Sequence, residues 1–255
     1  MLPIRKQVAL SNLEICFPES DLKWRLRIVR SSYINLSIDL LEFLYLPKFN
    51  YERLEKSVSS KDFDDLVKGI ENENGIFFLS GHFSNWELIA FSFPVITGYS
   101  LNIITKKQAS KKLNLLINKF RSLSGNKMIE TGMTLKEALR VVKQKKPVCF
   151  LVDQAGHPDY SVYSEFFGMN VASFAGPAKL ALAERPELIF AFMVRQPNFE
   201  FRVHSNHIYY DDLNDKSKES LEILTQRIQS EVEKAIREYP EQWLWFHKRF
   251  KHSRS

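Results

Sequence analysis

Gly75-Ile76-Phe77-Phe78-Leu79-Ser80-Gly81-His82-Phe83-Ser84-Asn85-Trp86-Glu87 is the stretch that decides the fold. Its first part is a short apolar run bounded by glycines, which is typical of a strand covered on both faces of a sheet. A helix is predicted to follow from about Asn85 to Phe93, where Pro94 is expected to end it. The stretch therefore predicts a strand, a turn and a helix in succession, with polar side chains gathered in the turn.

The alternation of strands and helices continues along the chain. Further strands are predicted over residues 101–105 and 148–152, with helices over 111–123 and 134–144 between them. Alternating strands and helices indicate an α/β fold with a mainly parallel central sheet flanked by helices. After a loop over residues 154–172, the pattern predicts a helix over 176–184, an antiparallel pair of edge strands over 188–195 and 199–207, and a long helix over 216–238.

The N-terminal part has a different pattern. Apolar residues recur at helical spacing from Asp21 to Leu46, which predicts one or two amphipathic helices, and residues 51–70 form a weaker helical candidate. No repeat, linker or low-complexity run interrupts the 255 residues. We therefore expect a single domain, with a helical N-terminal part over 1–70 and an α/β core over 71–255.

Composition narrows the class of partner. The formal net charge is +6 and the pI is near 9.1, so anionic partners such as a phospholipid surface, an acidic carrier protein or nucleic acid are favoured. Cys16 and Cys149 lie far apart, and neither a metal site nor a disulfide framework is indicated. No stretch approaches the roughly 18 apolar residues of a membrane span.

His82 and Glu87 are the first candidates for chemistry. Five residues apart on one helix, they would point about 140° away from each other, so His82 must precede the helix that Glu87 begins. With Ser84 as N-cap, the Glu87 carboxylate can turn back to orient His82 as a general base. The same letters also fit a Ser-x-x-Glu capping box, in which Glu87 only starts the helix. Spacing alone leaves both interpretations open.

The chain resembles the late acyltransferases of lipid A biosynthesis, the lauroyl- and myristoyltransferase family, in five ordered blocks besides the N-terminal stretch Asn12–Pro18. These blocks are Gly81–Glu87, Phe150–Gln154, Phe166–Gly168, Ser173–Ala178 and Pro240–Phe250. The resemblance covers essentially the whole chain. It implies a glycerolipid-acyltransferase-like fold and an enzyme that moves a fatty acyl chain from acyl carrier protein or coenzyme A to a hydroxyl of a lipid A precursor.

The same resemblance assigns site residues. His82 and Glu87 are the expected catalytic pair, and no cofactor is expected beyond the thioester co-substrate. Arg121 is expected to recognise a phosphate or the oxyanion, and Asp153 to orient Arg121 or the acceptor. The remaining expected substrate contacts are Asn85, Lys106, Gln154, Phe167 and Gly168. Lys106-Lys107 stands where the family commonly has Arg-Pro, a departure that leaves the acceptor open.

Other acceptors and locations follow from the same residues. A lysophospholipid, a phosphatidylinositol mannoside or another glycolipid is the alternative acceptor, and a non-catalytic lipid-binding module is the alternative class. Nucleic acid is not expected, since no nucleic-acid motif is recognised.

Family members usually begin with an apolar anchor helix that is missing before Arg5. We therefore expect a location at the cytoplasmic face of the bacterial inner membrane, either peripheral or held by an anchor missing from this chain. Trp243 and Trp245, beside basic residues, suit a membrane interface or packing against the domain.

Overall fold

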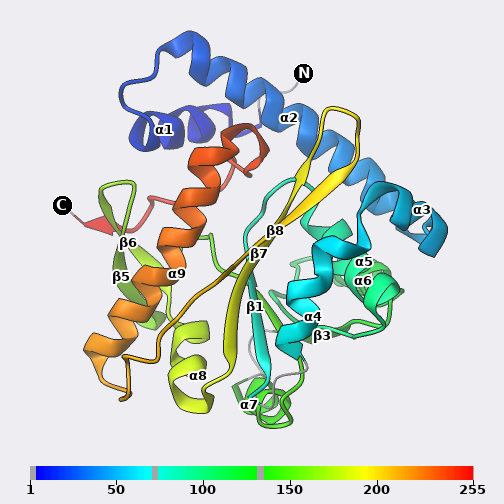
Figure 1. Cartoon of the computed structure of the whole chain (residues 1–255). Coiled ribbons are helices and arrows are strands. Elements are labelled where there is room, and N and C mark those ends of the chain that lie inside the picture. Colours follow the sequence, from blue (N-terminus) through cyan, green and yellow to red (C-terminus); the bar gives the residue numbers. More distant parts are fainter. Residues whose placement is uncertain (1–3, 71–73, 131–134, 255) are drawn as a thin grey trace.

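The computed structural model describes residues 4–70, 74–130 and 135–254. Within this part of the chain, six strands form one sheet in the order β3-β2-β4-β1-β7-β8, and three form a smaller sheet, β5-β6-β9. Neighbours in the large sheet pair in parallel except β7 and β8, which are antiparallel at one edge. The predicted α/β class is confirmed (Figure 1). The strands of the large sheet are β1 (Ile76–Ser80), β2 (Asn102–Thr105), β3 (Lys127–Glu130), β4 (Val148–Leu151), β7 (Glu187–Arg195) and β8 (Phe201–His207).

Two apolar cores lie on opposite faces of the large sheet. Phe77 and Leu79 of β1 belong to one core and Ile76 and Phe78 to the other, because successive side chains of a strand alternate between faces. All of β1 is buried, which explains its unbroken apolar sequence. In Figure 1, the helices α8 and α9 stand on one side of β1 and β7, and α4 and α5 on the other. The first core includes α7 (Leu135–Lys143), α8 (Gly176–Glu184) and α9 (Lys218–Glu238), and the second α3 (Tyr51–Ser57), α4 (Asp64–Ile70) and α5 (Trp86–Thr97).

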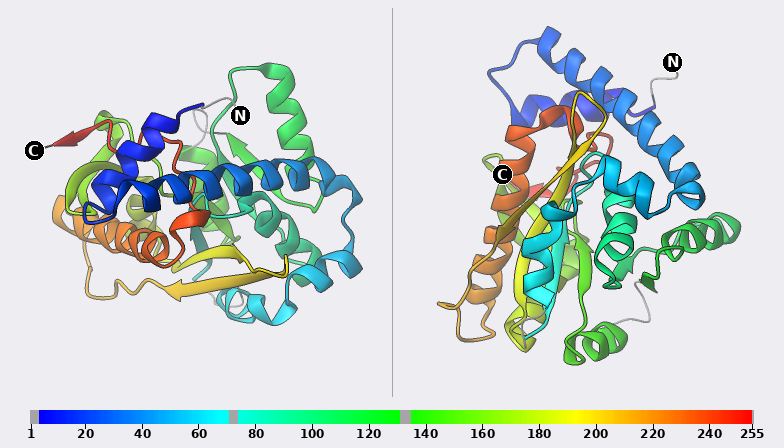
Figure 2. Two further views of the ribbon diagram at one scale, coloured as in Figure 1. Left: turned by 90° about the horizontal axis from the view of Figure 1, so that it is seen from above. Right: turned by 45° about the vertical axis from the view of Figure 1, so that its right-hand side comes forward.

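The predicted N-terminal helices are present as α1 (Lys6–Cys16) and α2 (Leu22–Tyr45). Asp21 caps α2, since its carboxylate accepts the Trp24 N–H at 2.6 Å. Arg195, at the end of β7, anchors the inner face of α2 through bonds of 2.7 Å to Asp39 and Glu42. Figure 2 shows α2 running across the molecule above the sheet. The inner face of α2 is thus tied to the carboxyl end of β7.

Pro94 does not end the helix that it was expected to end. Helix α5 continues to Thr97 and stops at Gly98, which adopts φ 80°. Pro94 has no N–H for the Ala90 carbonyl, but the buried Asn126 side chain donates to that oxygen at 2.6 Å instead. The same side chain accepts the Leu101 N–H at 2.9 Å. A compensating partner from another segment therefore allows the helix to pass through proline.

Four strands lie in segments where none was expected. Strand β3 lies between α6 (Lys111–Arg121) and α7, and the predicted loop over 154–172 contains β5 (Ser161–Phe166) and the start of β6 (Met169–Phe174). Strands β5 and β6 pair in an antiparallel hairpin, and β9 (Ser253–Arg254) adds to its edge. The helical candidate over 51–70 is divided into α3 and α4, and residue 134 of the helix predicted over 134–144 lies outside the described residues. The other predicted elements are present with boundaries shifted by at most a few residues.

The aromatic and basic C-terminal segment packs inside the molecule. Trp243, Trp245 and Arg249 are among the most deeply buried large side chains. The Arg249 guanidinium donates to the Ala172 carbonyl at 3.0 Å and to Gln229 Oε1 at 2.9 Å, and lies over the ring of Phe166. Packing against the domain is therefore confirmed for both tryptophans, and an interfacial belt is not their role.

Over the described residues, we find no helix with the length and apolar character that a membrane crossing requires. The division into parts 1–70 and 71–255 of one domain stays a prediction.

Candidate active site

The turn after β1 positions the predicted catalytic histidine. His82 precedes helix α5, as the spacing predicted, and Ser84 adopts a positive φ of 40° in the turn. The N-cap of α5 is Asn85, whose side chain accepts the Leu88 N–H at 2.9 Å, and not Ser84. The Ser84 N–H donates to the Gln242 carbonyl, and the Glu87 carboxylate is turned elsewhere. The Ser-x-x-Glu capping box is therefore absent.

Asp153 is the carboxylate that holds His82. Its Oδ1 lies 2.8 Å from Nδ1 of His82, and its Oδ2 accepts the His82 backbone N–H, also at 2.8 Å. The indole N–H of Trp243 donates to the same Oδ2 at 2.8 Å. Burial by itself would raise the pKa of Asp153, but the charge of His82 and the bonds from His82 and Trp243 outweigh it and lower the pKa to about 2. Asp153 is thus an ionised carboxylate that accepts a hydrogen bond from the Nδ1–H group of His82.

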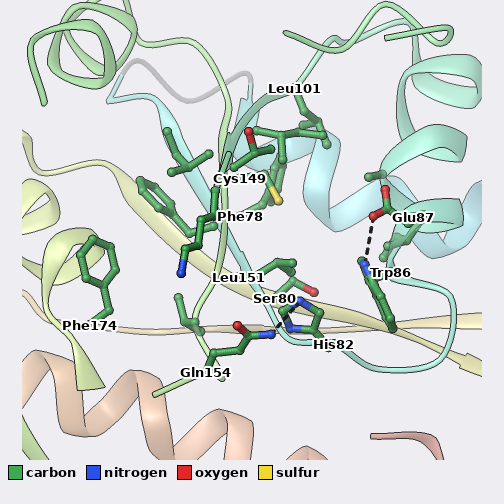
Figure 3. A pocket seen from close by; sticks show the side chains of 18 of the residues that line it. Phe78, Ser80, His82, Trp86, Glu87, Leu101, Cys149, Leu151, Gln154 and Phe174 are labelled. Carbon is green, nitrogen blue, oxygen red and sulfur yellow. Dashed lines mark hydrogen bonds between the residues drawn. The ribbon is translucent and has the colours of Figure 1, made fainter. Parts of the chain in front are cut away.

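The second ring nitrogen of His82 faces the pocket. In the neutral imidazole, the hydrogen bond to Asp153 keeps the proton on Nδ1, so that Nε2 carries the lone pair and can act as a base. The side-chain amide of Gln154 lies 3.3 Å from this nitrogen, as Figure 3 shows. The Trp86 ring meets the imidazole edge-on, with centroids 4.9 Å apart. Gln154, which was predicted as a substrate contact, therefore lies where a hydroxyl would approach His82.

Glu87 pairs with Arg121 and not with His82. Nε of Arg121 donates to Oε2 of Glu87 at 2.9 Å and Nη2 donates to Oε1 at 2.5 Å, in a bidentate ion pair. The Trp86 indole N–H also donates to Glu87, at 3.1 Å. Burial would lower the pKa of Arg121, but its bonds to Glu87 outweigh this and raise it.

Two predicted pairings are therefore corrected: Glu87 does not orient His82, and Asp153 does not orient Arg121. The reason is geometric. Glu87 lies in the first turn of α5 and faces α6, whereas His82 and Asp153 each follow the carboxyl end of one of two adjacent parallel strands. The expected membership of Glu87 in the catalytic machinery stays a prediction.

A pocket of about 770 Å³ opens beside His82. The polar side chains of His82, Glu87, Arg121 and Gln154 lie at one part of it, and the rest is mostly apolar. Such a volume is within the roughly 300–1,000 Å³ typical of small-molecule sites. In Figure 3, Phe78, Leu101 and Cys149 lie away from His82 along the pocket. The apolar wall comes mainly from the second core, with Leu66, Phe78, Ile89, Phe93, Leu101, Ile103, Cys149 and Ala191.

A split in the sheet makes room for the pocket. Strands β2 and β4 pair only at Asn102 with Val148 and at Ile103 with Cys149. The residues that follow in both strands, Ile104 and Thr105 in β2 and Phe150 and Leu151 in β4, line the pocket. The pocket therefore lies where two parallel strands part at their carboxyl ends, a common ligand position in α/β sheets.

The other predicted substrate contacts divide into two groups. Lys106 lines the pocket and is exposed. Asn85 is buried, caps α5 and donates to Glu42 at 2.6 Å, so its role is structural. Phe167 and Gly168 form the β5–β6 turn and are not among the pocket residues. Phe167 packs under the Arg237 guanidinium and against Phe17, which corrects its assignment as a substrate contact.

Three side chains of the site were not predicted. Trp243 fixes Asp153, as described above. His247 Nε2 accepts the Ala155 N–H at 3.1 Å and so supports the loop that carries Gln154; burial lowers the pKa of His247 to about 4, which keeps it neutral. Burial also raises the pKa of Cys149 to about 12, so its thiol serves as a pocket wall and not as a nucleophile. All three are far from His82 in sequence, and only their place in the C-terminal motif or in a buried strand hinted at them.

Comparison with known proteins gives a consistent result. A family model described as bacterial lipid A biosynthesis acyltransferase matches residues 2–252. The lipid A biosynthesis palmitoleoyltransferase of Escherichia coli is 23% identical over 256 residues, covering 97% of this chain and 79% of that protein. The lipid A biosynthesis myristoyltransferase of the same organism is 22% identical over 248 residues, covering 95% and 74%. Lipid A biosynthesis acyltransferase 2 of Shigella flexneri is 22% identical over 250 residues, covering 97% and 78%.

Proposed function

Because the chain belongs to the bacterial lipid A biosynthesis acyltransferase family, and is therefore an acyltransferase, we propose that it transfers a fatty acyl chain from a thioester to a hydroxyl of a lipid A precursor. The observation that carries this proposal is the His82–Asp153 pair, whose second imidazole nitrogen, Nε2, faces a mostly apolar pocket.

His82 is proposed as the general base. Its Nε2 takes the proton of the acceptor hydroxyl as the oxygen attacks the thioester carbonyl, and Asp153 stabilises the imidazolium that forms. The new carbon–oxygen bond is the ester of the product. When the carbon–sulfur bond breaks, the proton passes from the imidazolium to the departing thiolate. Asp153 suits this role because it is ionised and held in place by the Trp243 indole.

Gln154 is proposed to change partner during the reaction. Its amide now lies on Nε2 of His82, so the acceptor hydroxyl must displace it. The displaced N–H group remains beside the reacting carbonyl and can donate to the oxygen that becomes negative. The supporting loop is fixed by His247 through the Ala155 N–H, which limits how far Gln154 can move.

Glu87 and Arg121 are proposed to position the pocket wall. A bidentate ion pair at side-chain exposures of 14% and 18% is held rigidly and joins α5 to α6 across the pocket. With its charge balanced by Glu87, Arg121 is a poor isolated phosphate receptor, whereas exposed Lys106 at the pocket rim is free of this constraint. We therefore assign contact with an acceptor phosphate to Lys106 and alignment to the Glu87–Arg121 pair.

The acyl chain is proposed to lie in the apolar part of the pocket. Burial of each methylene group contributes about 0.8 kcal/mol, so a long chain gains most of its binding energy there. Acyl carrier protein or coenzyme A supplies the thioester, and both are anionic, which suits the net charge of +6. We place the reaction at the cytoplasmic face of the inner membrane, because the acceptor is a membrane lipid.

Product formation tests this proposal. The purified protein is incubated with a donor that carries a labelled acyl chain, either as a thioester of acyl carrier protein or as acyl coenzyme A. The acceptor is a detergent-dispersed lipid A precursor, and a lysophospholipid is the competing acceptor. His82→Ala is expected to abolish transfer, whereas His207→Ala, which changes an exposed histidine of β8, leaves it intact. Absence of product with every donor, or equal rates for His82→Ala and wild type, would contradict the proposal. Transfer only to the lysophospholipid would replace the acceptor and keep the chemistry.

A further inference from the structure

The outward face of α2 is covered by apolar side chains. Leu22 and Leu41 are 62% and 67% exposed, although both are large and aliphatic. The helix has 24 residues, so at 1.5 Å per residue this face extends for roughly 36 Å. A soluble helix face of this length normally carries charged residues of both signs. The exposed apolar residues of α2 are Leu22, Leu26, Ile34, Leu40, Leu41, Leu44 and Tyr45.

The only charged residues exposed within Leu22–Tyr45, all of which the structure describes, are cations. Lys23, Arg27 and Arg30 are exposed beside the leucines. The two acidic residues of this helix point the other way: Asp39 is buried and Glu42 is half-buried, and both bind Arg195. The outward face of α2 is thus apolar and cationic together.

Helix α6 repeats this composition next to the C-terminal end of α2. Leu113, Leu115 and Leu116 are exposed, and the sequence of α6 contains no acidic residue. The rings of Phe43 in α2 and Phe120 in α6 lie 5.5 Å apart, which joins the two helices. The exposed cations of α6 are Lys111, Lys112 and Lys119.

We propose that the exposed faces of α2 and α6 form a docking surface for a bilayer that contains anionic phospholipid. Leucines that enter the headgroup region beside lysine and arginine side chains are the composition of interfacial helices. An acidic carrier protein would engage the cations and leave a long row of leucines in water. A second copy of the chain, docked through the same face, would bring cations against cations. The lipid surface satisfies both components at once.

The site lies directly behind this surface. Glu42, on the inner side of α2, accepts a hydrogen bond from Asn85, the residue that begins the helix carrying Glu87. An α-helix with its side chains is about 10 Å across, so the headgroups would lie roughly one helix diameter from the loop of His82. This step rests on the proposed function: an acceptor lipid can present its hydroxyl to His82 while its own chains stay in the leaflet.

Vesicle binding tests the docking surface without any reaction. The full chain is sedimented with vesicles of phosphatidylcholine alone and of equal parts phosphatidylcholine and phosphatidylglycerol, with neither acyl donor nor acceptor present. We expect binding to the anionic vesicles only, weakened by salt. The combined variant Leu40→Ser, Leu41→Ser, Leu44→Ser and the pair Arg27→Glu, Arg30→Glu should each lower the affinity at least tenfold, since each cation near an anionic surface contributes about fivefold. The control, Phe199→Ser with Tyr209→Ser, removes two exposed aromatic residues elsewhere and should bind normally.

Separate outcomes would overturn this proposal. Wild-type protein that does not sediment with either vesicle, or variants that bind as well as wild type, would exclude α2 as the docking surface. A variant that loses only binding of acyl carrier protein would reassign the surface to that partner, and a dimer in light scattering that the leucine variant abolishes would reassign it to a second copy. The α2 variants should keep full transfer to detergent-dispersed acceptor, so failure of docking is distinguishable from failure of the acyltransfer proposal.

Discussion

Replacement of Asp153 by asparagine tests which of two carboxylates, Asp153 or Glu87, supports His82. In the structure, Asp153 accepts a hydrogen bond from Nδ1 of His82, whereas Glu87 binds Arg121. An asparagine turned so that its amide N–H faces Nδ1 would require that nitrogen to accept, which moves the imidazole proton to Nε2. The nitrogen that should take the hydroxyl proton would then have no lone pair.

The expected loss comes chiefly from the wrong tautomer, since the same exchange in Ser-His-Asp enzymes costs about 10⁴-fold in kcat. The pKa of Asp153 is lowered to about 2 by its interactions with His82 and Trp243, so the native residue is a carboxylate, whereas the uncharged asparagine does not stabilise the imidazolium. We expect kcat for Asp153→Asn to fall by about 10³–10⁴-fold. The partner Glu87→Gln keeps the shape of the site and should lose about 10–100-fold, as expected for a positioning group.

The rate of single-turnover transfer from the acyl thioester of acyl carrier protein is measured for both variants, and KM for this donor is measured separately. Urea unfolding controls for stability, because the buried Trp243 indole loses a charged partner in Asp153→Asn, at a cost of about 1–3 kcal/mol. A folded Asp153→Asn enzyme within tenfold of wild type, together with a Glu87→Gln enzyme slowed by 10³-fold or more, would refute this assignment and restore the His82–Glu87 pair.

Three further predictions concern the support of the site and its pocket. Asn126→Ala should lower the free energy of unfolding by about 2–4 kcal/mol in urea titrations, since the Ala90 carbonyl and the Leu101 N–H lose a buried partner; adding Pro94→Ala should recover part of this loss, and no recovery would argue against the compensation. His247 binds a proton in the unfolded chain near its ordinary pKa of 6.5 but in the native state only near 4, so native stability is unaffected above about pH 7 and falls as the pH drops from 7 to 4. Discounted for partial exposure, the effect is about 1–2 kcal/mol, and the pH dependence of unfolding should be shallower by that amount in His247→Gln. Cys149→Phe should shift donor preference toward shorter acyl chains, by several-fold for each methylene excluded, in competition between donors of different length; an unchanged preference in a folded variant would place the chain elsewhere.

The elements with strong local patterns are those that the sequence predicts well. The apolar run of β1, the spacing of α2 and the alternation of strands and helices require no knowledge of the tertiary structure. Pro94 is a misleading stop signal because the Asn126 side chain that replaces its missing N–H belongs to another segment. Strands β5 and β6 escaped prediction because their polar residues are satisfied by distant partners, such as Arg249 against Ala172 and Ser173.

The site residues were largely predictable and their pairing was not. His82 and Asp153 were each singled out, but their contact depends on the strand order, which places β4 beside β1. In the observed register, Ser80 lies opposite Leu151, so the residues two positions beyond each strand are His82 and Asp153. The contact between His82 and Asp153 can be predicted only when the strand order is known. Glu87 is close to His82 in sequence and was therefore assigned as its partner.

The attachment of the C-terminal segment to the turn after β1 has a consequence for protein synthesis. Phe83 and Trp243 form a β-bridge, the Leu244 N–H donates to the His82 carbonyl at 3.0 Å, and the Trp243 indole fixes Asp153. His82 and Asp153, the proposed catalytic pair, both leave the ribosome well before Trp243 does. A nascent chain can therefore pair β1 with β4 before the Trp243 indole is available, and the Asp153 carboxylate becomes fixed only after the segment that carries Trp243 has been synthesised.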